Sequence, residues 1–455
     1  MSKEHKRIQL SDHFTYRRLG CFVLPSIVMM IFTSIYGIVD GLFVSNFVGE
    51  TAFGAVNLVM PVMYVLSSVG FMIGTGGSAL VGQQLGEGKN EEAKRTFTLL
   101  ILVLFIAGTI LSILGYIYMP QIVRLLGGEG ELADLAVVYA RISMISMPFY
   151  MLQTSFQSFL VTAEKPRLGL GITITAGVTN MVMDYVLIAI FDWGIAGAAA
   201  ATAMSEIIGG SVPVFYFFAK NNSLLHFTKT AWNTGFVLNA CGNGISEFFS
   251  NIAGPLVMMV YNLQLLRFAG EDGVVAYGVH MYANFIFSAI IMGFMVGSAP
   301  LYSFHFGAKN YRELHNLYSK AMRFLTVAGV SITVLSWVMA PLLASIFVGY
   351  DAELLDFTVH AMRIICLQFL FVSYAFFGSG FYTALGCGIT SAVLAVMRMV
   401  GFQLPALLLL AVSFGIDGVW ASGPVANALS ALLTFIFLIK DRNRLGYGKY
   451  AASKE

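Results

Sequence analysis

The chain has 455 residues, of which 58% are hydrophobic and only 11% charged, and its mean hydropathy is +0.79. Water-soluble domains carry about 25% charged residues, so this composition excludes a soluble globular protein. The net charge of +2 says nothing about binding partners. Because the apolar runs are about 20 residues or longer, they fit membrane-crossing helices and not barrel strands, and we predict an all-α integral membrane protein.

Twelve apolar segments follow one another along the chain. Several are longer than a bilayer requires, so tilted helices are expected. The start of the chain is polar and basic and lacks the pattern of a cleavable signal peptide. The predicted helices cover residues 18–48, 51–82, 96–119, 133–163, 168–191, 194–219, 234–266, 273–305, 318–347, 354–385, 388–412 and 416–439.

The basic residues predict the orientation of these helices. With twelve crossings, 21 of the 26 Lys and Arg residues lie on the side of the N-terminus and four on the other side. The remaining residue, Arg398, lies within a predicted span. By the positive-inside rule, we expect a multi-pass protein of the cell (inner or plasma) membrane with both termini in the cytoplasm.

The two halves of the chain resemble each other. "GSALVGQQLGEGKN" at 77–90 recurs as "GSAPLYSFHFGAKN" at 297–310, and "ELADLAVVYARI" at 131–142 as "ELLDFTVHAMRI" at 353–364. Six helices per half give both halves the same orientation, related by a pseudo-twofold axis along the membrane normal. We therefore predict an N-terminal six-helix lobe at 1–222, a cytoplasmic linker at 223–233, a C-terminal six-helix lobe at 234–440 and a cytoplasmic tail at 441–455.

Polar side chains in the first half fall at similar membrane depths. At 1.5 Å per residue, Asp40, Asp184 and Thr202 each lie about 12–13 Å from the outer end of their helices. Asn180 and Glu206 lie one helical turn deeper than Asp184 and Thr202, respectively, and on the same faces. A carboxylate costs roughly 2.5–3.5 kcal/mol at the centre of a membrane helix, so each acidic residue is a candidate functional group.

Two carboxylates, an amide and a hydroxyl supply oxygen ligands, which suit a hard cation such as Na⁺. Two neighbouring carboxylates in a low dielectric suit proton binding equally well. A buried hydrogen-bond network that only fixes helix packing is the alternative. The second half does not repeat the cluster, because the positions equivalent to Asn180, Asp184 and Thr202 are Gly401, Pro405 and Gly423.

Other residues are weaker candidates. Glu247 lies near the middle of its span and is a possible additional coupling site or substrate counter-ion, unless Arg398 neutralises it as part of a structural pair. Pro25 predicts a kink in the first helix, which makes that helix a candidate moving part. The possible contacts of a substrate cavity, each of which could also serve only helix packing, are Tyr36, Asn57, Tyr64, Gln153 and Gln157.

Five segments carry a known pattern, namely "YGIVDGLFV" at 36–44, "AFGAVNLVMPV" at 52–62, "GQQLGEGKNEEAKR" at 82–95, "NMVMDYVLI" at 180–188 and "GIAGAAAATAMSE" at 194–206. In their order and in its twelve duplicated helices, the chain resembles the MATE (multidrug and toxic compound extrusion) transporters, prokaryotic type, over nearly its whole length. The resemblance implies export of organic, often cationic or aromatic compounds in exchange for H⁺ or Na⁺. It also implies a first-lobe cation site at Asp40, Asn180, Asp184 and Thr202 and a bending helix at Pro25. A second-lobe acidic pair known in some members is incomplete here, because the segment "CLQFLFVSYAFFGSGFYTAL" at 366–385 of the tenth helix has no acidic residue.

We therefore expect a cation-coupled antiporter that works by alternating access, and not an enzyme. A flippase for a lipid-linked oligosaccharide precursor is the alternative, which would call for a strongly cationic cavity. We expect no cofactor beyond the coupling ion and no metal beyond a possible Na⁺ at the four first-lobe residues. The expected partners are a small organic substrate and the lipid bilayer, without nucleic acid, and the expected state is a monomer.

Overall fold

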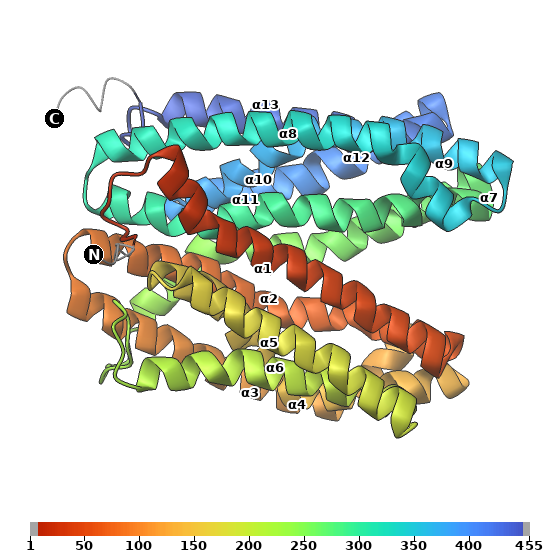
Figure 1. The fold of residues 1–455 in the computed structure, drawn as a ribbon, viewed down its shortest axis with the longest axis horizontal. Coiled ribbons are helices and arrows are strands. Elements are labelled where there is room, and N and C mark those ends of the chain that lie inside the picture. Colours follow the sequence, from red (N-terminus) through yellow and green to blue (C-terminus); the bar gives the residue numbers. More distant parts are fainter. Residues whose placement is uncertain (1–7, 449–455) are drawn as a thin grey trace, which may run out of the picture.

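The structure, a computed structural model, describes residues 8–448, and in this part of the chain every regular element is a helix (Figure 1). Within these residues, eleven helices are long and apolar enough to cross a membrane. One of them, α7, has 74 residues and leaves helical backbone angles at Gly270 (φ 62°, ψ −147°), so it accounts for two crossings. The predicted twelve-helix fold is confirmed, and each predicted span lies almost entirely within one helix or within a run of consecutive helical elements.

The helices follow the chain in the predicted order. Short π-helical turns (η1, η2 and η4) and one 3₁₀ turn (η3) interrupt the longer spans. The elements are α1 (Tyr16–Phe43), η1 (Val44–Val48), α2 (Glu50–Gly86), α3 (Asn90–Leu125), α4 (Gly130–Thr162), α5 (Pro166–Asp184), η2 (Tyr185–Ile190), α6 (Gly194–Phe218), α7 (Thr234–Gly307), α8 (Tyr311–Val348), α9 (Ala352–Ile365), η3 (Cys366–Gln368), α10 (Phe369–Ala384), α11 (Gly388–Val396), η4 (Met397–Gln403), α12 (Leu404–Phe414) and α13 (Ile416–Asp441).

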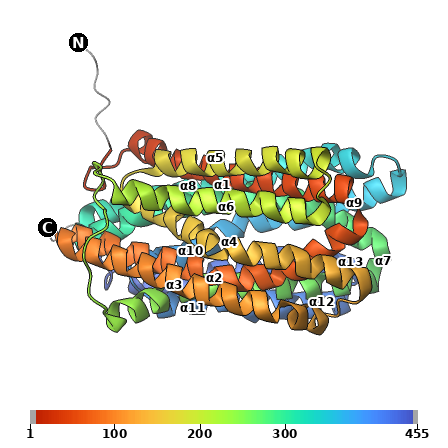
Figure 2. The ribbon, with the colours of Figure 1, turned by 90° about the horizontal axis from the view of Figure 1, so that it is seen from below.

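The helices form two groups that lie side by side. Figure 1 shows α3, α4, α5 and α6 in one group and α8 to α13 in the other, with α1, α2 and α7 between them, and Figure 2 gives the view from below. Residues 219–233 join the groups without a helix. The structure describes the predicted tail 441–455 only as far as Gly448, and residues 449–455 lie outside the described part.

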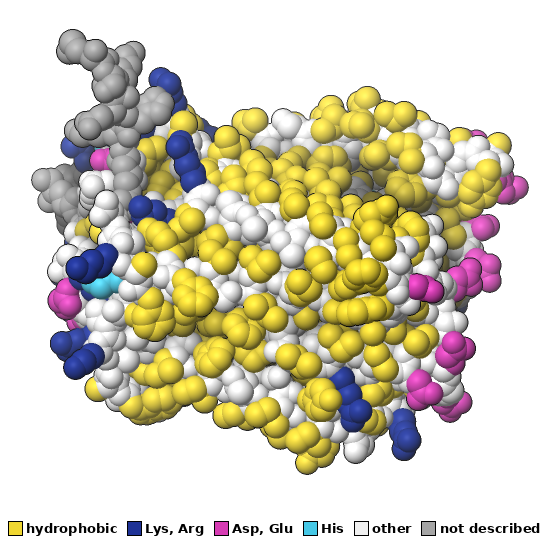
Figure 3. Space-filling view, turned by 60° about the horizontal axis from the view of Figure 1, so that its bottom comes forward, with side chains coloured by type: hydrophobic (Ala, Val, Ile, Leu, Met, Phe, Trp, Pro, Cys, Tyr) yellow, Lys and Arg dark blue, Asp and Glu magenta, His cyan; other side chains and the backbone are white. Residues whose placement is uncertain are grey.

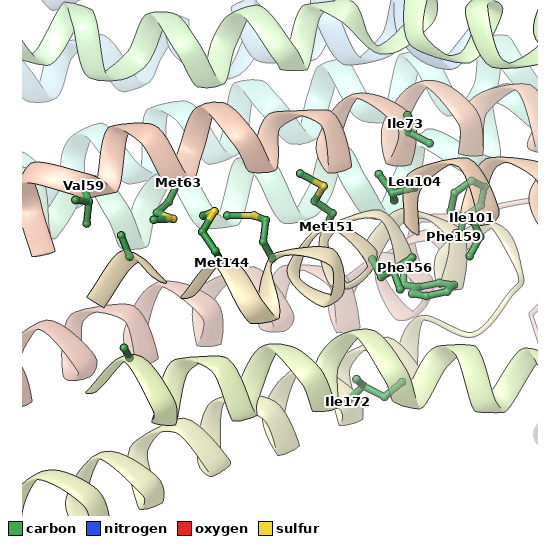
Figure 4. Close-up of a cluster of buried hydrophobic side chains, with 14 of the residues drawn as sticks. Val59, Met63, Ile73, Ile101, Leu104, Met144, Met151, Phe156, Phe159 and Ile172 are labelled. Atoms are coloured by element: carbon green, nitrogen blue, oxygen red, sulfur yellow. The ribbon is translucent and has the colours of Figure 1, made fainter. Parts of the chain in front are cut away.

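The core of the first lobe consists of apolar side chains from α2, α3, α4 and neighbouring helices (Figure 4). Phe97 stacks edge-on against Phe156, Phe159 and Phe217, with ring centroids 4.9–6.4 Å apart. Met144 and Met151 fill the space beside α2 and are fully buried. The unbranched methionine side chain suits such irregular gaps. Many of the methionines and phenylalanines are therefore packing residues.

The two copies of the repeated segment pack against each other where the lobes meet. A Cβ atom at Gly82 would collide with Ser303, and one at Gly86 with the backbone at Phe304, because α2 and α7 lie backbone to backbone there. Gly307 is equally close to the backbone at Gln83. Small residues allow this close approach of membrane helices. Glycines within the two repeated segments thus form this contact between the lobes, although these three glycines are not themselves repeated.

Charged side chains separate between the two ends of the bundle. Lys and Arg gather mainly at the end where Ile8 and Gly448 lie, which we call the terminal end, and Asp and Glu gather at the opposite end (Figure 3). A broad apolar surface separates them. The inter-lobe contacts at Gly82, Gly86 and Gly307 lie in the parts of α2 and α7 nearest the terminal end.

Candidate cation-coupling site

Two acidic side chains lie near the opposite end of the first lobe, on neighbouring helices. Asp40 lies in the last turn of α1, and Asp184 is the last residue of α5. A π-helical turn follows each of them, η1 after α1 and η2 after α5. Such turns widen the helix locally and occur often at functional sites. The chain therefore departs from regular α-helix beside both carboxylates.

The structure brings together the four residues of the predicted cluster. Asn180, Asp184 and Thr202 lie next to the Asp40 carboxyl group. The Asn180 Nδ2 amide donates to Thr202 Oγ1 at 3.4 Å, which links α5 to α6. Asp184 and Asn180 are 0% and 2% exposed, whereas Asp40 is half-buried. Three helices thus place two carboxylates, an amide and a hydroxyl at one point.

The cluster is short of hydrogen-bond donors. Four acceptor oxygens are buried without a hydrogen-bond partner, namely Asp40 Oδ1, Asn180 Oδ1 and both carboxylate oxygens of Asp184. A buried acceptor without a partner costs about 1–3 kcal/mol, and a charged one costs more. Native proteins rarely leave such groups unpaired. These oxygen atoms fit a bound cation or added protons, because either would supply the partners that the oxygens lack.

Glu206 lies beside the cluster but has a partner of its own. The Ser146 hydroxyl of α4 donates to Glu206 Oε2 at 2.5 Å. The negative charge of Glu206 still reaches Asp40 and Tyr36. A third acidic group therefore adds to the negative potential of the first lobe without joining the four-residue cluster.

Two residues of α4 at this place were not among the sequence candidates. Tyr139 is 3% exposed and lies near Asp40, Thr202 and Glu206, and Ser146 bonds to Glu206. Their seven-residue spacing places both on one face of α4. That spacing was visible in the sequence, but only the packing of α4 against α6 shows that this face points at the acidic residues.

The predicted cavity residues differ in their exposure and in their neighbours. Tyr36 and Tyr64 lie close to one another, and Tyr64 is 45% exposed. The Asn57 amide donates to the carbonyl of Phe53 within its own helix at 2.9 Å.

The two predicted glutamines lie on α4. Gln153 is buried against Gly209 of α6, at the contact between the two helices. Gln157 is half-buried. Tyr36 lies near both Tyr64 and Asp40, and the five-residue cavity as a whole stays a prediction.

Glu247 and Arg398 face each other in the second lobe but form no ion pair within 4 Å among the described residues. Arg398 is 6% exposed, lies 3.9 Å from the ring centre of Phe376, and donates from Nη2 to Ser250 Oγ at 3.3 Å. Its Nε and Nη1 donors are buried without a partner. The charges of Glu247 and Arg398 nevertheless attract each other across this gap.

Pro25 lies buried in the first half of α1, which runs as one helix from Tyr16 to Phe43. The next residues, Ser26 and Ile27, touch Gly293 of α7. Pro25 thus lies beside a contact between the lobes, at a distance of fifteen residues from Asp40 along the helix. The helix continues without a break through Pro25, and the kink there stays a prediction.

A two-lobed bundle of twelve membrane helices with an acidic cluster in one lobe is the architecture of a membrane transporter. The family profile MatE matches the chain twice, at residues 25–186 and 248–409. The two matches cover more than half of the sequence, and they start 223 residues apart. The chain therefore belongs to the MATE family of transporters, and each half carries one copy of the family's repeat.

Named relatives and solved structures agree with this assignment. The chain is 24% identical over 444 residues to the multidrug export protein MepA of Staphylococcus saprophyticus, covering 97% of each protein. It is 24% identical over 431 residues to MepA of Staphylococcus aureus, covering 94% of each. A crystal structure of MATE in complex with MaL6 matches with a TM-score of 0.91 at 19% identity, over 97% of this chain and 100% of that one.

A second solved structure has a similar fold. It is described as the outward-facing conformation of a multidrug resistance MATE family transporter of the MOP superfamily. It matches with a TM-score of 0.91 at 19% identity, over 98% of this chain and 100% of that one. At this identity the likeness establishes the twelve-helix fold alone.

Proposed function

We propose that this transporter is an antiporter that exports organic, often cationic or aromatic compounds and is driven by entry of H⁺ or Na⁺ at the first-lobe cluster. One observation carries the proposal: four acceptor oxygens of Asp40, Asn180 and Asp184 are buried together without donors. Binding a cation there relieves a cost of several kcal/mol. The released free energy is then available to change the packing of α1 and α5.

The export of drugs is supported by the relatives, which are named multidrug export proteins.

The difference in polar residues between the lobes supports coupling in the first lobe. Gly401, Pro405 and Gly423 stand where the first lobe has Asn180, Asp184 and Thr202, and the second lobe buries Arg398 instead. A positive charge there disfavours binding of a second cation.

The position of the contacts between the lobes supports alternating access. The contacts of Gly82, Gly86 and Gly307 lie near the terminal end, whereas Asp40 and Asp184 lie near the opposite end. Separation of the lobes at one end and then at the other would expose a central site to each side in turn.

The concentration of Lys and Arg at the terminal end supports an orientation in the plasma membrane with both termini in the cytoplasm. The flippase alternative is not favoured, because Arg398 is the one basic residue deep within a described span.

Efflux of ethidium from a bacterial strain that lacks its own pumps tests the proposal. Asp40→Asn and Asp184→Asn should each reduce efflux at least about tenfold, because removing a charged ligand costs roughly 1.5–3 kcal/mol. Asp192→Asn is the matched control, since Asp192 is an exposed carboxylate near the same end. Near-normal efflux in both cluster variants, at normal expression, would refute the proposed site.

The coupling ion can be identified in proteoliposomes. Purified protein is given an inward Na⁺ gradient at constant pH, and then a proton gradient without Na⁺. We expect one of the two gradients to drive substrate movement in the wild type, and the same gradient to fail in Asp184→Asn. Substrate movement that is equally fast without either gradient would contradict an antiport mechanism.

A further inference from the structure

We infer that residues 8–15, which we call the N-terminal strap, act as a clasp that holds the two lobes together at the terminal end. The strap precedes α1 of the first lobe but lies against α8 of the second. It touches a carboxylate from each lobe, Glu164 and Glu313. The inference rests on the alternating access proposed above. It adds a contact that favours the state closed at the terminal end over the state open there.

Glu313, in the first turn of α8, is the attachment point on the second lobe. Its Oε1 accepts the backbone N–H of Phe14 at 2.9 Å, and its Oε2 lies 2.6 Å from Nδ1 of His13. The Asn316 amide also donates to Oε1 at 2.8 Å. The carbonyl of Phe14 in turn accepts from Asn316 at 3.1 Å and from Lys320 at 2.5 Å. Two strap residues are thus fixed to the first turns of α8, in part by charge-assisted hydrogen bonds.

Glu164, in the loop between α4 and α5, is the attachment point on the first lobe. Its Oε1 accepts the backbone N–H of Leu10 at 2.7 Å. Glu164 itself has a φ of 58°, which is uncommon for a residue other than glycine. The loop therefore holds this carboxylate in a costly backbone conformation, in which it meets the strap.

Apolar burial reinforces both attachments. Leu10 and Phe14 are 0% exposed and belong to one cluster with Leu314 and Leu317 of α8 and Val161 of α4. Full burial of a leucine or phenylalanine side chain contributes about 1.5–3 kcal/mol. The strap thus fills a junction that is built from both lobes.

Separation of the lobes at the terminal end would undo these contacts together. As α8 moved away from the α4–α5 loop, either Glu313 or Glu164 would lose its strap partners, and Leu10 and Phe14 would meet water. Each loss favours the closed terminal end. The clasp lies far along the helices from Asp40 and Asp184, so it acts on the balance between states without touching the coupling cluster.

The distance between the lobes at this end tests the inference without any need for transport. The full chain, with Cys21, Cys241, Cys366 and Cys387 replaced, carries spin labels at Arg95→Cys of α3 and Lys440→Cys of α13 in lipid nanodiscs. Glu313→Ala should increase the ratio of long to short distances at least about tenfold, since hydrogen bonds to charged groups contribute roughly 1.5–3 kcal/mol. Glu164→Ala should shift the ratio in the same direction.

Glu91→Ala is the matched control. Glu91 also lies in the first turn of a helix at the terminal end, but its partner Lys94, at 2.7 Å, is on the same helix. The distance distribution of the spin-labelled Glu91→Ala variant should match that of the spin-labelled chain without this substitution. Unchanged distributions in both Glu313→Ala and Glu164→Ala would overturn the inference, and they would do so whether or not the protein exports drugs.

A cross-link gives a second arm that does not depend on weakening the fold. The pair His13→Cys and Glu313→Cys replaces two side chains whose ends lie 2.6 Å apart, and a short bifunctional methanethiosulfonate reagent should join the two thiols. The cross-linked protein should keep the short distance under all conditions and lose efflux, and cleavage of the cross-link by a reductant should restore the long distances and the efflux. Long distances or undiminished efflux in the cross-linked protein would also overturn the inference. Single-cysteine variants control for the substitutions themselves.

Discussion

At the level of single residues, the two lobes differ in the kind of polar group that they bury without a partner. The first lobe collects acceptor oxygens, from Asp40, Asn180 and Asp184, that have no donors. The second lobe buries the guanidinium of Arg398, whose Nε and Nη1 donors have no acceptors. An unpaired buried ion is costly in either case. The first arrangement can be relieved by a cation that arrives from outside the protein, and the second only by a negative group such as Glu247.

Removal of the neutral ligands should weaken the cation site without destroying it. Asn180→Ala and Thr202→Ala each delete one oxygen ligand and leave both carboxylates in place. We expect the concentration of the coupling ion that gives half-maximal transport to rise about threefold to tenfold, which corresponds to roughly 0.7–1.4 kcal/mol. Transport assays at increasing ion concentration measure this. An unchanged half-maximal concentration in both variants would assign the two residues to helix packing.

Glu247 and Arg398 should be coupled in stability. Glu247→Gln removes the negative charge nearest to Arg398 and should lower the melting temperature, because the guanidinium is then buried without compensation. Arg398→Met in the same chain should recover most of the loss. Thermal unfolding of both single variants and the double variant gives the interaction free energy, for which we expect about 1 kcal/mol or more. Additive effects of the two substitutions would show that the residues act independently.

At the scale of elements, the contact between α2 and α7 depends on the absence of side chains. Gly76 and Gly244 meet backbone to backbone, and Asn243 beside them donates to the carbonyls of Gly76 and Thr383 at 3.2 and 2.9 Å. The duplicated segments continue this contact toward the terminal end. The repeat therefore serves as the surface on which the two lobes meet.

Gly244→Ala should disturb this contact, and Gly242→Ala should not. A Cβ atom at Gly244 would collide with the carbonyl of Met72, whereas one at Gly242 meets no atom within 4 Å. Overpacking costs about 1–3 kcal/mol, and alanine in place of a helical glycine is otherwise slightly favourable. We expect a lower melting temperature only in Gly244→Ala. Equal melting temperatures would mean that the lobes part at this point at no cost.

At the scale of the whole molecule, the charge distribution predicts the orientation in the membrane. Most Lys and Arg residues lie at the terminal end, and the opposite end carries carboxylates such as Glu50, Glu131 and Asp192 (Figure 3). The loops of a membrane protein that carry the basic residues stay in the cytoplasm. In both lobes the excess of Lys and Arg lies at the terminal end, because each half of the chain crosses the membrane an even number of times.

Cysteine labelling of intact cells tests this orientation. In a chain without its native cysteines, Leu125→Cys should react with a membrane-impermeant maleimide, because Leu125 is 87% exposed at the opposite end. Lys229→Cys, in the segment that joins the lobes, should react only after the cells are opened. Labelling of Lys229→Cys in intact cells would reverse the predicted orientation and, with it, the proposed direction of transport.

The sequence by itself determined the number and order of the helices, the duplication and the identity of the four-residue cluster. These features follow from the length of the hydrophobic segments, the recurrence of similar sequence segments and the rarity of charge in a membrane. All three are read directly from the order of residues along the chain. Counting along single helices placed Asp40, Asp184 and Thr202 at one depth, because the rise per residue is constant.

Tertiary structure alone decided which groups touch. It placed Tyr139 and Ser146 beside the acidic residues, packed Gln153 against Gly209 of α6, and left Glu247 and Arg398 close but unpaired. It also joined Leu10 and Phe14 to carboxylates 154 and 299 residues away. No pattern in a single helix encodes these contacts, because they depend on the rotation of each helix about its axis and on which neighbour it packs against.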